Sequence, residues 1–210
     1  MNYADATPLA EKFLSLVSPV CVRAEVVGSW KRKKQENIHD LEILLIQKPG
    51  HPLPEFGRPK NIYPTHLDKL LADLEYREVI RQAADKKDGA KLKKRAIVGA
   101  GLNEFCIEFY IVTPATWGLQ NLIRTGNSWF SHRCVTNKSV MAWNRETGAK
   151  AAGFLPDEFR YVKGKDLESG ESCIKRGDEI IPLPEESDVF NLIFGKWIEP
   201  KDRVGYAEKR

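Results

Sequence analysis

Carboxylates in two apolar segments are the residues of this chain whose spacing most clearly suggests chemistry. Asp40 and Glu42 stand in HDLEILLI (39–46), and Glu108 stands in FCIEFYIV (105–112) as the only charge between residues 105 and 115. Side chains two residues apart in a strand point the same way, about 6.6 Å apart, so Asp40 and Glu42 should share a face. Two acids on a buried face repel each other and lose hydration, and a cation between them offsets this cost in free energy.

If the two segments are neighbouring strands, the three carboxylates converge on one face. Oxygen donors on a rigid sheet suit Mg²⁺, and two such ions can clamp an in-line displacement at phosphorus. The alternative is structural, with Asp40 and Glu42 on a solvent-facing strand and Glu108 paired to an arginine.

A Gly-Ser turn precedes the first acidic segment, in GSWKRKK (28–34). Gly28 allows backbone N–H groups to approach a phosphate, the Ser29 hydroxyl can donate, and a following helix N-terminus favours anions. Lys31 or Arg32 can neutralise a triphosphate. The turn therefore favours a phosphate ligand beside the acids.

Hydrophobic periodicity predicts the elements that position these residues. We expect helices over 5–17, 29–34, 64–76, 113–126, 128–148 and 185–194, a loop over 50–61, and strands within 21–28, 39–47, 77–84, 91–99, 104–114, 153–164 and 172–184. This mixture predicts an α+β protein. A change of character near residue 113 predicts two subdomains, 1–113 and 114–210, with separate sheets.

Charge and composition narrow the choice of partners. The net charge is only +4, but residues 58 to 95 hold eleven Lys and Arg against six Asp and Glu. This excess indicates either a solvated hairpin or phosphate contacts to nucleic acid. The candidate DNA-binding residues are Arg58, Lys60, Lys86, Lys87, Lys91, Lys93, Lys94 and Arg95.

Other features indicate a reduced, non-membrane setting. The four cysteines lie far apart without metal-ligand spacing and are expected to be reduced thiols. No apolar run reaches the length of a membrane span, and the N-terminus lacks a signal pattern. We expect a cytoplasmic monomer, in a bacterial or viral context.

The order GSxxR, then DxE, then a solitary acid in an apolar strand resembles the nucleotidyltransferase superfamily with the DNA polymerase beta fold. The chain continues with IVTPATWGLQNLIRTGNSWFSHR and ends with GDEIIPLPEESDVFNLIFGKWIEPKDR. Both segments resemble the family X DNA polymerases. The resemblance implies a mixed-sheet palm with helices in 1–113 and a small α+β thumb for nucleotide selection in 114–210. Because only 27 residues precede Gly28, it implies a minimal form without the N-terminal lyase domain.

The resemblance also implies roles for individual residues. Gly28, Ser29 and Arg32 would hold the triphosphate, and Thr125 and Gly126 would line the nucleotide through their backbone. The carboxylates would be both catalytic residues and metal ligands for two Mg²⁺ ions: Asp40, Glu42 and Glu108.

The function implied is a repair-type DNA polymerase that adds deoxynucleotides to a primer 3′ end, with gapped DNA and a nucleoside triphosphate as partners. Two of the three acids are Glu where the family usually has Asp, and this predicts slow turnover or a preference for Mn²⁺. Ile123 and Arg124 replace aromatic residues common before the Thr-Gly turn. Alternatives are therefore template-independent transfer to RNA or to a small-molecule hydroxyl, or a catalytically inactive DNA-binding homologue.

Overall fold

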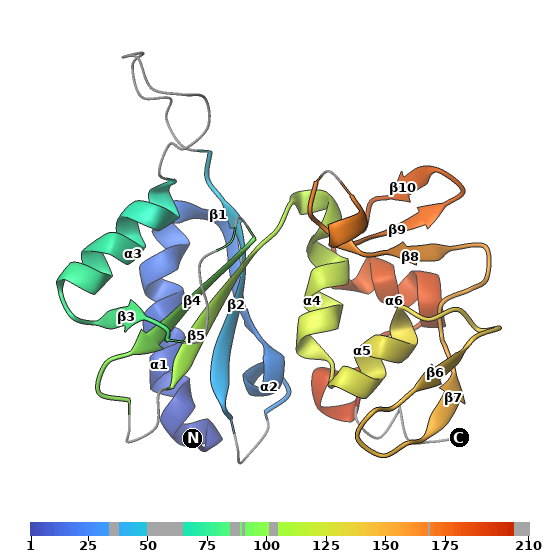
Figure 1. Cartoon of the computed structure of the whole chain (residues 1–210), viewed down its shortest axis with the longest axis horizontal. Helices are drawn as coiled ribbons and strands as arrows, with labels where there is room; N and C mark the ends of the chain where they lie inside the picture. The colour runs from blue at the N-terminus through green and yellow to red at the C-terminus, as the bar shows by residue number, and fades with distance from the viewer. Residues whose placement is uncertain are drawn as a thin grey trace.

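The computed structural model describes residues 1–33, 38–49, 65–84, 89, 91–100, 105–167 and 169–203. Within these ranges the chain is α+β, as predicted, and Figure 1 shows two helix-covered halves side by side. The strands are β1 (Cys21–Val27), β2 (Asp40–Gln47), β3 (Ile80–Gln82), β4 (Leu92–Ile97), β5 (Cys106–Ile111), β6 (Met141–Trp143), β7 (Lys150–Ala152), β8 (Arg160–Val162), β9 (Cys173–Arg176) and β10 (Glu179–Ile181). The helices are α1 (Tyr3–Val17), α2 (Gly28–Lys31), α3 (His66–Tyr76), α4 (Trp117–Thr125), α5 (Ser128–Cys134) and α6 (Glu186–Phe194).

The first half is built on one mixed sheet with the order β1-β2-β5-β4-β3. Only β2 and β5 pair in parallel, and the other neighbours are antiparallel. The intervening α3, β3 and β4 return the chain so that β5 lies beside β2. This pairing sets Glu42 directly opposite Glu108.

One face of this sheet forms the main hydrophobic core. Residues of alternate strand positions, including Leu41, Ile43 and Phe109, are fully buried against α1 and α3 (Figure 1). Helix α1 presents Ala6, Ala10, Phe13 and Val17 to this core at helical spacing. The opposite face carries the acids at one end and, two residues further along, Leu44 and Tyr110 packed with Trp117 of the second half.

The second half has its own core, in which α4, α5 and α6 pack together (Figure 1). Strands β8, β9 and β10 form a three-stranded sheet, and β6 and β7 form a separate pair. All four cysteines of the chain are buried and free. In the described ranges, no helix combines the length and apolar character needed to cross a membrane.

One predicted element is wrong. The expected helix over 128–148 ends at Cys134, and its second part instead forms β6 after a turn in which Val140 N–H donates to the Asn137 carbonyl oxygen (3.0 Å). β7, which was not predicted, pairs with β6. Asn137 and Ser139 favour turns over helix interiors, and cross-strand pairing then decides the structure.

A buried charge network joins the two halves. Glu186, at the start of α6, accepts from the Arg203 guanidinium at 2.7 Å and lies 3.3 Å from the Lys31 ammonium of α2. Lys31 also lies 2.6 Å from Glu25 and donates to Asn121 Oδ1 at 2.8 Å. Arg203 is fully buried and Glu186 nearly so. Removal of either partner would therefore leave an uncompensated buried charge between the two halves.

We expect Glu186→Ala to destabilise the protein by about 3 to 5 kcal/mol, since it leaves buried Arg203 without its carboxylate. The matched control is Asp73→Ala, which removes an exposed pair with Arg77 and should change the free energy of unfolding by less than about 1 kcal/mol. Urea denaturation of both variants measures the difference, and equal losses would contradict the structural role of the network.

Candidate active site

The three predicted acids lie on one face of the sheet. Asp40 and Glu42 alternate with buried residues on β2, and Glu108 stands opposite Glu42 on β5. Glu108 is only 7% exposed. The parallel pairing therefore brings together carboxylates that are 66 and 68 positions apart in the chain.

Burial and mutual repulsion dominate the electrostatics of this face. The pKa of Glu42 is raised from 4.5 to about 7, chiefly by burial and then by the negative charge of Asp40, against the opposing effects of Arg124 and Arg32. The pKa of Asp40 is also raised, by burial first and by Glu108 second. Raised pKa values on neighbouring acids indicate a site short of positive charge.

Glu108 is held by residues that the sequence did not single out together. The Tyr110 hydroxyl donates to its carboxylate, and the Lys94 ammonium, on the antiparallel neighbour β4, lies 3.7 Å from it. Burial raises the pKa of Tyr110 well above its ordinary value, so its hydroxyl keeps the proton it donates. Glu108 thus sits behind Glu42, anchored from two sides.

Gly28 is required by the close approach of Glu42. Its φ is +74°, and a Cβ at this position would lie 2.0 Å from Glu42 Oε2. The residue follows β1 and begins the short helix α2, which also carries Ser29. The predicted Gly-Ser turn is therefore packed directly against the acidic face.

Arg32 links this turn to the second predicted turn, at the end of α4. Its guanidinium donates to the carbonyl oxygens of Thr125 (2.7 Å) and Gly126 (3.1 Å). The Thr125 hydroxyl in turn donates to Asn121 Oδ1 at 3.0 Å. Burial lowers the pKa of Arg32, while Glu42 opposes that shift. One cation thus joins the two halves at the site.

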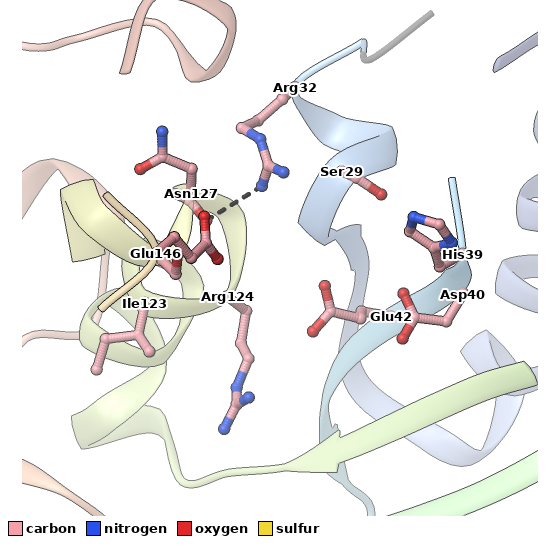
Figure 2. Close-up of a pocket in the computed structure, with 11 residues that line it drawn as sticks. Ser29, Arg32, His39, Asp40, Glu42, Ile123, Arg124, Asn127 and Glu146 are labelled. Carbon is pink, nitrogen blue, oxygen red and sulfur yellow. Dashed lines mark hydrogen bonds between the residues drawn. The ribbon is translucent and has the colours of Figure 1, made fainter. Parts of the chain in front are cut away.

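Arg124 is a second cation of the site. Its guanidinium lies 3.8 Å from the centre of the Tyr110 ring of β5, and the side chain projects from α4 on the side that faces the sheet (Figure 2). Its buried Nε has no hydrogen-bond partner among the described residues. Arg124 opposes the upward pKa shift of Glu42, so its positive charge offsets part of the repulsion among the acids.

These residues line one open cleft of about 440 Å³ between the two halves (Figure 2). The first half contributes Ser29, Arg32, His39, Asp40 and Glu42. The second half contributes Ile123, Arg124, Gly126, Asn127, Ser128 and Glu146. Gly28, Glu108 and Thr125 lie behind this lining and support it. Glu146 was not predicted, because only the tertiary fold brings the segment after β6 to the cleft.

The predicted DNA-binding cations are engaged in ion pairs where the structure describes them. Lys91 lies 2.5 Å from Glu171, Lys93 lies 3.0 Å from Asp68, and Arg95 pairs with Glu75. Lys94 belongs to the acidic face through Glu108. The other candidates lie outside the described residues: Arg58, Lys60, Lys86 and Lys87.

The donor chemistry of the face fits a hard divalent cation. Asp40 and Glu42 present carboxylates to the cleft, and their raised pKa values are the response expected of acids that lack a counter-charge. Within the described ranges, no three His, Cys, Asp or Glu side chains gather as a group that would hold a metal ion. As placed, Glu108 is satisfied by Tyr110 and Lys94.

No protein-family model matches this chain, and no curated protein matches its sequence.

Two glycines with similar backbone angles test the contact between the turn and the acid. Gly99 has φ +78° and open space around its missing Cβ, so Gly99→Ala should cost only the left-handed strain, about 1 to 2 kcal/mol. Gly28→Ala should cost about 1 kcal/mol more, because the carboxylate end of the Glu42 side chain must move away from the new Cβ. Urea denaturation in a Glu42→Ala background should remove that excess, and an excess that persists would contradict the contact.

The pKa of Glu42 predicts how stability depends on pH in the absence of metal. The native carboxyl keeps its proton up to about pH 7, whereas the unfolded one loses it near 4.5. The native state therefore binds more protons between these values, and stability should fall as pH rises, by on the order of 3 kcal/mol. Unfolding in EDTA from pH 4.5 to 7.5, with Glu42→Gln for comparison, measures this. Parallel curves for the two proteins would contradict it.

Proposed function

We propose that this protein is a metal-dependent nucleotidyltransferase that adds deoxynucleotides to a DNA primer 3′ end, as a small gap-filling DNA polymerase of the family X type. The observation that carries the proposal is the cleft, in which Asp40 and Glu42 face Ser29 and Arg32. Acids short of positive charge beside a Gly-Ser turn and an arginine suit a metal-bound triphosphate.

Each residue has a chemical task in this proposal. Ser29 and the Gly28 backbone bind phosphate oxygens, and Arg32 exchanges its carbonyl partners for the triphosphate. Asp40 and Glu42 would hold Mg²⁺, and Glu108 would join them as third oxygen donor by giving up its contacts with Tyr110 and Lys94. When bound, Mg²⁺ lowers the pKa of the attacking hydroxyl and neutralises charge on the leaving group.

The reaction is a single displacement at phosphorus. The primer 3′-oxygen forms a bond to the α-phosphorus as the bond between that phosphorus and the bridging oxygen breaks, and pyrophosphate leaves. The hydroxyl proton passes to water in the open cleft. The protein contributes positioning and electrostatics, with no covalent intermediate.

Arg124 favours a second candidate, transfer to another acceptor without a template. It lies on the cleft wall contributed by α4, beside Ile123, where family X enzymes commonly carry aromatic residues against the sugar. Comparison of deoxynucleotides with ribonucleotides separates the two candidates.

Extension of a labelled primer on one-nucleotide-gapped DNA tests the proposal, with Mg²⁺ and Mn²⁺ and with the same primer alone. Asp40→Asn should lower the rate at least about 1,000-fold, equivalent to about 4 kcal/mol of lost transition-state stabilisation. Asp178→Asn, at a fully exposed position of the second half, should leave the rate unchanged.

The outcomes separate the candidates. Template-directed extension that vanishes in Asp40→Asn supports the polymerase. Extension of the primer alone, or equal use of ribonucleotides, supports the second candidate instead. DNA binding without extension under either metal contradicts the polymerase and leaves transfer to an acceptor other than DNA, or a catalytically inactive DNA-binding protein.

A further inference from the structure

The β6–β7 hairpin presents an apolar face that nothing in the described chain covers. Met141 is 58% exposed and Trp143 is 53% exposed, and as residues i and i+2 of β6 they share a face. The intervening Ala142 is buried. A tryptophan left half in solvent on a two-stranded sheet indicates a binding surface.

The charges of this hairpin suit a polyanion. Lys150 stands opposite Trp143 in the antiparallel register, so the ammonium and the indole lie on the same face. The segment 138–152 also carries Lys138 and Arg145, both exposed, and its one acid is Glu146. Positive charge beside an exposed aromatic ring is the combination that binds phosphate and stacks a base.

The hairpin is continuous with the cleft. Asn144 fixes its turn: the Asn144 side-chain oxygen accepts from Glu146 N–H at 3.0 Å, and its backbone carbonyl accepts from Gly148 N–H at 2.8 Å. Glu146, in this turn, lines the cleft next to Asn127 (Figure 2). A strand that leaves the cleft on this side therefore meets Trp143 within a few residues of the turn.

We infer that the exposed face of the β6–β7 hairpin binds an unpaired stretch of nucleic-acid strand beside the cleft, with a base stacked on Trp143 and phosphates near Lys150 and Arg145. The identity of that strand as the template of a gapped DNA rests on the proposed function. The cations of the segment favour a nucleic acid, whose phosphates they can bind. A protein partner would need only the apolar side chains of Met141 and Trp143.

Fluorescence anisotropy of labelled oligonucleotides in EDTA, without nucleotide, tests this surface apart from catalysis. Trp143→Ala should weaken binding of a duplex with a single-stranded extension by about 5- to 100-fold and leave a blunt duplex unaffected. Lys150→Gln should weaken binding and reduce the dependence of log K on log salt by about one unit. The matched control is Tyr76→Ala, an 89% exposed aromatic at the end of α3, in the other half (Figure 1).

Equal effects of Trp143→Ala and Tyr76→Ala would overturn the inference. So would sedimentation showing a dimer that Trp143→Ala dissociates, since the face would then bind a second copy. Because Trp143 is half exposed, the variant should fold, and its unfolding midpoint checks this. If the protein extends no primer but its affinity for DNA depends on Trp143, the polymerase proposal is wrong and the binding surface is supported. If the protein extends primers but Trp143→Ala leaves DNA binding unchanged, the polymerase proposal is supported and the binding surface is wrong.

Discussion

The burial of Asp40, Glu42 and Glu108 together on one face of the sheet is the constraint around which the rest of the site is arranged. Burial is the first cause of the raised pKa values of Asp40 and Glu42; the charge of Glu108 adds to the shift of Asp40, and the charge of Asp40 adds to that of Glu42. Four cationic or donor side chains compensate the face: Arg32, Arg124, Lys94 and Tyr110. In the proposed function, a bound metal ion would supply the positive charge that these side chains do not.

The cleft exists because the second half is docked at that face, and polar contacts hold it there. Arg32 binds the two carbonyl oxygens at the end of α4, while Lys31, one residue earlier, enters the network around buried Glu186. The adjacent residues Lys31 and Arg32 thus contact the second half at two places, Glu186 and the end of α4. In the proposed function, a ligand that takes Arg32 from those carbonyl oxygens would loosen one contact between the halves, while the Glu186 network would remain.

Period-two alternation was sufficient to predict that Asp40 and Glu42 share a face, and the Gly28-Ser29 sequence was sufficient to predict a turn beside them. Whether β2 and β5 are neighbours could not be predicted from the sequence, because strand order depends on the path of the segment between them. Arg124 and Glu146 were missed as site residues because each reaches the acids or the cleft through tertiary packing. Tyr110 shares the strand face of Glu108 by alternation, but its hydrogen bond to that carboxylate was not predicted. The basic run stays a prediction for DNA binding; among its described cations, Lys93 and Arg95 form ion pairs with Asp68 and Glu75 of α3, which belong to the same run.

The most direct test of the central claim, that the acidic face binds divalent metal together with a triphosphate, is a Mn²⁺ titration followed by electron paramagnetic resonance. It would be run with and without a non-hydrolysable deoxynucleoside triphosphate, on the unaltered protein and on Asp40→Asn. We expect about two protein-bound Mn²⁺ ions per chain when the analogue saturates the cleft, and a loss of that binding in the variant. Identical titrations of the two proteins would contradict the account.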